Sequence, residues 1–397
     1  MKEDISKLPV LNIGIVGHID HGKTTLLHAI TGRFADVHSE ELKRGITIKL
    51  GYADAILRKS SNGYSVKSGD PIRYLTFTDV PGHEMLMATM LSGAAIIDAA
   101  VLVIAANEGI KPQTREHLIA LQTKKINKII IVQNKIDLVS KEEAIKNFQI
   151  IKKFVKGTIA EDSPVIPLSA QQGINVDKLL EALAGVEIPD REDNGKPLFV
   201  VARSFDINKP GTSIKDLSGG VLGGALKKGK FKIGDMIEIK PGLSIKEKSG
   251  VRYETVKTKI LSIRRGTYEV KEAGPGGSLS IETSLDMSFT KADNLSGCVA
   301  GLEGQLPEIS SRLKLKASHF REVEGTETHE KIEEYKINDL LMLSINTSIT
   351  VGKIVSVKDG EVNLELNIPV VSFPKDSVGI AKNIAGHWRL VGVGEVI

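Results

Sequence analysis

Hydrophobic residues change their spacing along this chain near residue 190. Before that point, β-branched runs such as 11–16 alternate with stretches of helical period such as 113–124 and 141–154. This alternation predicts a parallel sheet with helices on both faces, joined by right-handed crossovers. After that point the hydrophobic runs are short, and glycine turns rather than helical stretches separate them. Such a rhythm is typical of closed β-barrels.

The polar segment 189–197 lies between the two patterns and is typical of a linker. A second break comes at Pro307, after which the strand rhythm resumes. We therefore expect an α/β nucleotide-binding domain at 1–196, followed by two β-barrel domains at 197–305 and 306–397.

A complete phosphate-binding loop begins the first domain. Residues 17–24 have the sequence Gly-His-Ile-Asp-His-Gly-Lys-Thr and lie between the apolar run 11–16 and a predicted helix. Strand, glycine-rich loop and helix in this order bind the phosphates of a nucleoside triphosphate. Lys23 would bridge the terminal phosphates and the Thr24 hydroxyl would bind Mg²⁺. The nucleotide-binding residues predicted here are Asp20, His21, Gly22, Lys23, Thr24 and Thr25.

Specificity for guanine is predicted by Asn134-Lys135-Ile136-Asp137, which follows the apolar run 128–133. The Asp137 carboxylate can accept both the N1–H and the exocyclic amine of guanine, and adenine has no such pair of donors. Another apolar run ends at Pro167-Leu168-Ser169-Ala170, whose backbone could reach the guanine O6. We therefore expect GTP or GDP, held at the base by Asn134, Lys135, Asp137, Ser169, Ala170 and Gln171.

Two further segments are predicted to respond to the γ-phosphate. Asp79 follows the strand 74–78 and can hold Mg²⁺ through a water, while the Gly82 N–H can bond the γ-phosphate. Upstream, Thr47 is suited to be the second protein ligand of Mg²⁺. His83 is the candidate for positioning the attacking water, and its alternative is a histidine on a surface loop.

These motifs resemble those of the translational GTPases, and the resemblance continues at 44–48, 106–109 and 112–117. More narrowly, 202–212, 219–224 and 386–390 resemble the gamma subunits of archaeal and eukaryotic translation initiation factor 2. The resemblance covers the chain from about residue 8 to its last residue. It implies a P-loop GTPase domain of α/β class followed by two β-barrels.

The resemblance also implies a function. Members of this family carry initiator methionyl-tRNA to the small ribosomal subunit and act with alpha and beta subunits. A second Mg²⁺ is implied near Asp20 and the carbonyl of Gly45, and a solvent-facing Asp20 is the alternative. Two rival classes remain, namely another tRNA carrier of elongation type and a binding module that never hydrolyses its GTP.

One segment departs from the family. Many relatives have paired cysteines for a zinc site between the two switches, whereas 58–70 contains neither cysteine nor histidine. A tetrahedral zinc site needs such ligands. We therefore expect a polar hairpin or a mobile loop there, and no bound zinc.

Composition adds a few limits. The 397 residues, of which 41% are hydrophobic, can build two or three cores. The apolar stretches around Asp98 are too short to span a membrane and no signal peptide is visible. Cys298 is the single cysteine, which fits a reducing cytoplasm. A net charge of +4 permits an RNA partner without implying one.

Overall fold

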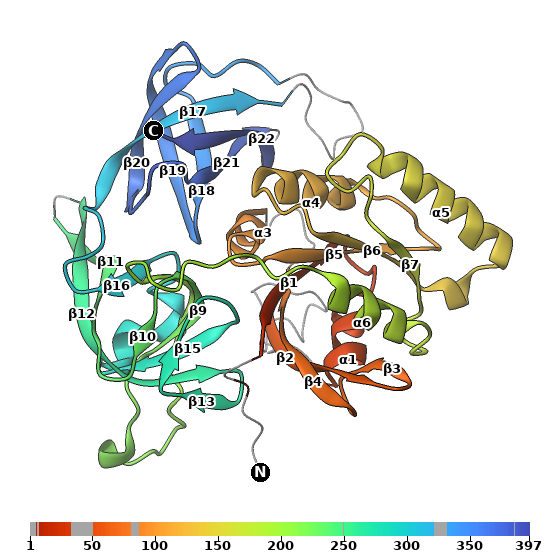
Figure 1. Ribbon diagram of the computed structural model, residues 1–397. Coiled ribbons are helices and arrows are strands. Elements are labelled where there is room, and N and C mark those ends of the chain that lie inside the picture. Colours follow the sequence, from red (N-terminus) through yellow and green to blue (C-terminus); the bar gives the residue numbers. More distant parts are fainter. Residues whose placement is uncertain are drawn as a thin grey trace. The chain divides into compact units, whose positions relative to one another are not determined.

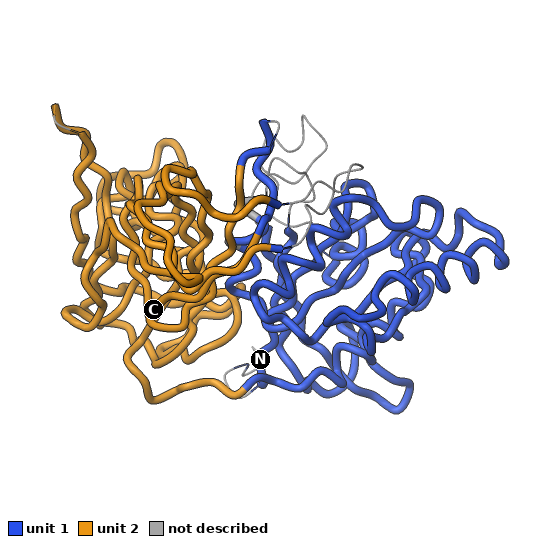
Figure 2. Tube along the Cα trace, turned by 90° about the horizontal axis from the view of Figure 1, so that it is seen from above, with its two compact units in different colours: residues 1–189, 320–332, 383–391 blue, residues 190–319, 333–382, 392–397 orange. Residues whose placement is uncertain are grey.

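The computed structural model describes residues 5, 8–32, 51–80, 87–248, 250–320, 332–384 and 386–397. Contacts divide the chain into two compact units, which Figure 2 draws in different colours. The first unit comprises residues 1–189 with 320–332 and 383–391, and the second comprises 190–319, 333–382 and 392–397.

The first unit contains a seven-stranded sheet in the order β3-β2-β4-β1-β5-β6-β7 (Figure 1). Strand β1 lies parallel to β4 and β5, and the parallel pairing continues through β6 to β7. By contrast, β2 is antiparallel to β4 and β3 is antiparallel to β2. The strands are β1 (Val10–Gly17), β2 (Gly51–Ser60), β3 (Gly63–Ser65), β4 (Asp70–Asp79), β5 (Ala99–Ala105), β6 (Ile129–Asn134) and β7 (Val165–Pro167).

Helices cover both faces of this sheet, as the alternating pattern predicts. Leucines of α1 and α6 join a core with the inward residues of β1, β5 and β6, and α3, α4 and α5 lie on the other face (Figure 1). None of the helices in the described part of the chain is long and apolar enough to cross a membrane. The helices are α1 (Lys23–Thr31), α3 (Met87–Ala94), α4 (Pro112–Thr123), α5 (Lys141–Val155) and α6 (Val176–Gly185).

Local signals explain where two of these helices begin. Helix α5 starts with a capping box, in which the Glu143 N–H donates to Ser140 Oγ over 3.2 Å and the Ser140 N–H donates to Glu143 Oε2 over 2.8 Å. Helix α4 has Pro112 at its first position, where a missing N–H costs nothing. Both helices lie within about a residue of the ranges that the sequence predicts.

The cysteine-free segment 58–70 contains the β2–β3 hairpin. Its Tyr64 and Val66 are partly buried and pack against the core that contains the fully buried Leu57. The expectation of a polar hairpin is therefore incomplete, because two apolar side chains attach this segment to the sheet. Among the described residues, no group of three or more His, Cys, Asp or Glu could hold a metal ion.

Two closed rings of strands follow in the chain. In the first ring the order is β11-β16-β8-β9-β15-β12, and β12 pairs again with β11. Phe199, Phe231 and Ile260 are among the fully buried side chains inside it. Its strands are β8 (Leu198–Phe205), β9 (Val221–Lys228), β11 (Met236–Glu247), β12 (Gly250–Arg265), β15 (Leu279–Thr283) and β16 (Val299–Leu302), with β13 (Tyr268–Val270) beside β12 and a small pair of β10 (Phe231–Lys232) with β14 (Glu272–Ala273).

Glycines in this first ring permit close approach of neighbouring strands. A Cβ atom at Gly224, on β9, would lie 2.0 Å from the carbonyl oxygen of Val200 on β8. One at Gly219 would lie 1.8 Å from the carbonyl oxygen of Thr283 on β15. Backbone atoms cannot rotate away as a side chain can, so these positions exclude any larger residue.

The second ring is a closed barrel in the order β17-β20-β19-β18-β21-β22. Within the second unit, the Thr347 hydroxyl donates to the carbonyl oxygen of Val201 over 2.9 Å, and the Leu306 N–H donates to Glu238 Oε1 over the same distance. The first ring therefore shares one buried hydrogen bond with the second ring and another with the segment that connects the two. The strands are β17 (Ser310–His319), β18 (Leu340–Ile345), β19 (Ser348–Lys358), β20 (Glu361–Val370), β21 (Ser377–Ile384) and β22 (His387–Val396).

Candidate nucleotide-binding site

The predicted phosphate loop connects β1 to α1, and its backbone is unusual at three positions. Gly17, Asp20 and Gly22 have φ values of 140°, 60° and 90°. A Cβ atom at Gly17 would lie 2.3 Å from the carbonyl oxygen of Val103, and one at Gly22 would lie 2.4 Å from Asn134 Nδ2. The protein's own neighbours therefore require these glycines, in addition to any requirement set by a ligand.

Lys23 lies buried beneath the loop. Its ammonium group donates to the carbonyl oxygens of Gly17 and His18 over 2.9 and 2.7 Å. Burial lowers the pKa of Lys23 to about 8. Within the described ranges no carboxylate lies within ion-pair distance of this ammonium, so its hydrogen bonds go to neutral groups. A buried cation with neutral partners fits a site for an anion.

Two further observations favour a phosphate group and an accompanying Mg²⁺ at this place. The N-cap residue of α1 is Gly22, and no side chain caps the first N–H groups of the helix. Such groups bind phosphate readily, since the helix dipole adds positive potential there. The Thr24 hydroxyl donates to Asp79 Oδ2 over 2.8 Å, which brings together two oxygen-bearing side chains from α1 and β4. Oxygen ligands of this kind are those that Mg²⁺ prefers.

Asn134 connects the phosphate loop to the predicted base site. Its Nδ2 donates to the carbonyl oxygen of His21 over 2.9 Å, and its Oδ1 accepts the Ala170 N–H over 3.0 Å. One buried amide thus joins the loops that follow β1, β6 and β7. Next to it, Lys135 has a left-handed backbone with φ 61°, and Asp137 is exposed on the short helix η3 (Ile136–Leu138).

The other predicted residues have mixed positions. Ser169 is buried and exchanges backbone hydrogen bonds with Ile174, whereas Gln171 is exposed. The Asp20 side chain is exposed and Thr25 is half-buried at the start of α1. The predictions for Gly45, Thr47, Gly82 and His83 fall outside the described residues.

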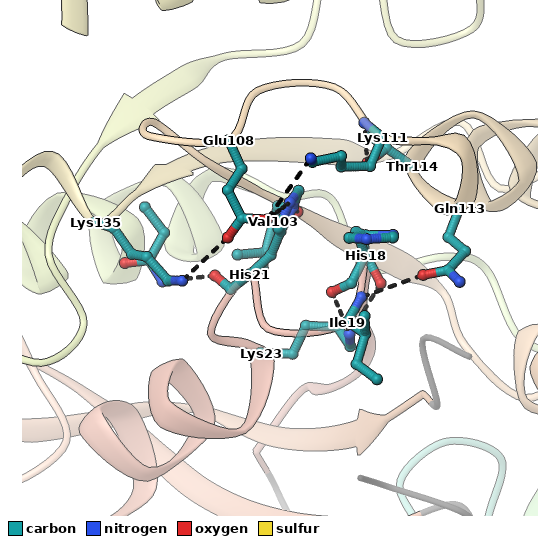
Figure 3. Close-up of polar contacts among 12 residues, drawn as sticks. His18, Ile19, His21, Lys23, Val103, Glu108, Lys111, Gln113, Thr114 and Lys135 are labelled. Carbon is teal, nitrogen blue, oxygen red and sulfur yellow. Dashed lines mark hydrogen bonds and ion pairs between the residues drawn. The ribbon is translucent and has the colours of Figure 1, made fainter. Parts of the chain in front are cut away.

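Two residues of α4 hold the phosphate loop, and neither was predicted from the sequence. The Gly17 N–H donates to His117 Nδ1 over 2.7 Å, and the Ile19 N–H donates to Gln113 Oε1 over 3.3 Å. Figure 3 shows Gln113 directed toward Ile19. Burial lowers the pKa of His117 to about 3, so its ring is neutral and can accept at Nδ1. The segment 112–117 carried a signal only as part of the family resemblance.

Comparisons with known proteins agree with this arrangement. The family described as the elongation factor Tu GTP-binding domain matches residues 8–188, and that described as the C-terminal part of initiation factor eIF2 gamma matches residues 311–396. Translation initiation factor 2 subunit gamma of Methanocaldococcus jannaschii is 47% identical and covers 100% of this chain and 99% of that protein. Its counterpart in Archaeoglobus fulgidus is 48% identical over 98% of this chain and 94% of that protein.

Solved structures show the same fold at lower identity. A bacterial selenocysteine-specific elongation factor, EF-Sec, superposes with a TM-score of 0.76 at 24% identity over 98% of this chain. This chain spans 58% of the length of that protein. Elongation factor SelB of Methanococcus maripaludis, in complex with a GTP analogue, superposes with a TM-score of 0.73 at 24% identity over 98% of this chain and 79% of that one.

The identity to the gamma subunits extends over the whole chain, and it covers both the nucleotide domain and the two rings of strands. The family resemblance and the predicted fold class are confirmed. This chain belongs to the translation initiation factor 2 gamma subunits, and it is a translational GTPase of initiation.

Proposed function

We propose that this GTPase carries initiator methionyl-tRNA to the small ribosomal subunit in its GTP form and releases it after hydrolysis to GDP and phosphate. The observation that supports this most directly is the 47% identity to an archaeal gamma subunit over 100% of this chain. Within the site, the Asn134 amide joins the phosphate loop to the loop of the predicted guanine site. The loops that would bind the phosphates and the base are therefore joined by one connected set of hydrogen bonds.

We assign roles within this site as follows. Lys23 and the N–H groups at the start of α1 would neutralise the terminal phosphates, and Asp137 would accept from guanine. Thr24 and Asp79 fit a role in holding Mg²⁺, with Thr47 as a further ligand. When bound, Mg²⁺ supplies positive charge that offsets the charge developing on the transferred phosphoryl group.

The remaining assignments come from the sequence. His83 would position the attacking water, and the Gly82 N–H would respond to loss of the γ-phosphate. Asp20 and the Gly45 carbonyl would bind a second Mg²⁺; the exposed Asp20 side chain is free to turn toward solvent or toward such an ion. The site has no cysteine, and we expect no zinc.

The nucleotide would control tRNA affinity by population shift. The γ-phosphate contributes contacts to one arrangement of the switch segments only, and tRNA would bind that arrangement more tightly. Alpha and beta subunits are expected partners because this chain belongs to the gamma family. We retain 1–196, 197–305 and 306–397 as its proposed domains.

Binding of charged tRNA tests this function. The protein loaded with a non-hydrolysable GTP analogue should retain initiator methionyl-tRNA on a filter at least about tenfold better than the GDP-loaded protein, since tRNA must distinguish the two forms. Elongator methionyl-tRNA is the matched competitor. Equal retention with both nucleotides would exclude a GTP-dependent carrier, and preference for the elongator would favour the rival elongation-type function.

A further inference from the structure

A single carboxylate lies between the phosphate loop and the loop of the predicted base site. Glu108 follows β5, and its Oε1 lies 3.4 Å from the ammonium of Lys135. Its Oε2 lies 4.0 Å from the ammonium of Lys111 and 4.0 Å from His21 Nε2. Figure 3 shows Glu108 between Lys135 and Lys111, with His21 below it.

His21 does not share the charge of Glu108. Burial lowers the pKa of His21 to about 4, so its ring is neutral near pH 7. His21 Nδ1 lies 3.3 Å from the carbonyl oxygen of Val103, which can only accept, so the single ring proton lies on Nδ1. Nε2 therefore presents a lone pair to Glu108 and carries no charge, so the cations within 4.0 Å of this carboxylate in the described part of the chain are those of the two lysines.

The two lysines are not equivalent partners. Lys135 is the closer, and its ammonium group is within hydrogen-bond distance of Glu108. Lys111 lies at the outer limit of an ion pair and its side chain is 39% exposed, against 26% for Lys135. The stronger electrostatic contact of Glu108 is thus with Lys135, because screening by water is greater around Lys111.

Lys135 also needs a restraint. Its backbone φ of 61° lies in the left-handed region, which L residues adopt at a cost. The preceding residue, Asn134, contacts the phosphate loop through the carbonyl oxygen of His21. A side-chain contact from Glu108 to Lys135 would hold the base loop in the same position from its other side.

We propose that Glu108 is a positioning residue for guanine nucleotides, which acts through Lys135 and slows nucleotide dissociation. This inference rests on the proposed base site. Glu108 itself would touch neither base nor phosphate. Loss of its charge would let Lys135 and the base loop move away from the phosphate loop, so that GDP and GTP leave sooner while the chemistry of hydrolysis is unchanged.

The test compares dissociation rates of a fluorescent GDP from the full-length protein. Glu108→Gln should dissociate GDP about fivefold faster, which corresponds to about 1 kcal/mol for loss of the charge from a partly exposed ion pair. In a Lys135→Met background, Glu108→Gln should have no further effect. Lys111→Gln should leave the rate within about twofold of wild type, because it removes only the weaker partner.

Salt separates positioning from a general loss of stability. Added salt should accelerate GDP release from wild type, since it weakens an ion pair, and should change release from Glu108→Gln much less. Glu181→Gln is the matched control, because Glu181 pairs with Lys178 over 3.0 Å on α6. Its release rate should equal that of wild type.

Other outcomes would overturn the inference. An unchanged rate in Glu108→Gln would contradict it, as would an equal acceleration in the Lys135→Met background. Failure of the wild type to bind GDP would instead refute the proposed nucleotide site. A melting temperature of Glu108→Gln far below that of Glu181→Gln would indicate a structural role and count against positioning.

Discussion

The phosphate loop and the β2–β3 hairpin both adjoin strands of the same sheet. Hydrogen bonds hold the loop in place, whereas apolar packing holds the hairpin. His117 and Gln113 accept hydrogen bonds from backbone N–H groups of the phosphate loop, and Asn134 donates one to a carbonyl oxygen of the loop. The hairpin is attached by the side chains of Tyr64 and Val66, which pack against an apolar core.

The difference follows from what each region must do. Hydrogen bonds are directional, so they fix the position and orientation of backbone N–H groups to a few tenths of an ångström. Apolar packing is less directional, but it contributes more free energy for each side chain. Substitutions in the polar network should therefore change ligand binding, and those in the apolar contacts should change stability.

The largest effect is expected at the base site. Asp137→Asn should weaken GTP binding by about a thousandfold, because the amide cannot accept both guanine donors and leaves polar groups unpaired. It should also improve binding of xanthosine triphosphate, whose 2-oxo group accepts from the new amide. Competition titrations with the two nucleotides measure this. Unchanged GTP affinity would refute the guanine assignment. It would also contradict the expectation that substitutions in the polar network change ligand binding.

A smaller effect, of the opposite kind, is expected beneath the hairpin. Leu57 is fully buried in the core of the first unit, and Leu57→Ala should lower the free energy of unfolding by about 3 kcal/mol. Chemical denaturation of the nucleotide-free protein measures this loss. GDP release from the folded variant should match wild type. If release accelerates as much as it does in Glu108→Gln, the two regions are not independent.

The third effect is a dependence of the free energy of unfolding on pH, caused by His117 in the polar network. Burial lowers the pKa of His117 to about 3, whereas a histidine in the unfolded chain titrates near 6.5. Between these values the unfolded state binds the extra proton, so stability falls as pH drops below about 6.5, by up to about 1.4 kcal/mol for each pH unit. Above that range both states are neutral and the contribution is complete.

His117→Asn isolates this contribution, because the Asn Oδ1, bonded to Cγ as His Nδ1 is, can still accept the Gly17 N–H but does not titrate. The difference in unfolding free energy between pH 7 and pH 5 should be about 2 kcal/mol smaller in this variant than in wild type. Identical pH profiles for wild type and His117→Asn would show that His117 is not held neutral by burial.

Sequence was sufficient for the parts of this protein that are continuous in the chain. The glycine loop, the strand before it and the helix after it lie within about twenty residues, and local spacing predicts all three. The contact between Gly17 and His117 joins residues that are 100 positions apart, and no periodicity connects them. No role was predicted for Glu108 for the same reason, because its partner Lys135 is 27 positions away in the sequence.

A polar hairpin was one of the two structures expected for the segment 58–70, and its apolar contacts with the core were not predicted. Its segment contains many polar residues, which favours an exposed loop. Tyr64 pairs with Lys59 in the β2–β3 register, and Val66 follows β3 two residues later; both side chains pack against the core. Register depends on tertiary packing, and a short strand carries too few alternating residues to indicate it.

Two glycines, one on β9 and one just before it, change how the family resemblance should be interpreted. The run 219–224 was one of the features that resembled the gamma subunits, yet Gly219 and Gly224 lie where a methyl group would meet a backbone carbonyl of the next strand. Relief would require the strands to separate and the wall of the ring to open. These two glycines are therefore required by the packing of the barrel strands and say nothing about what the protein binds. A chain with the same barrel and a different ligand would need the same glycines.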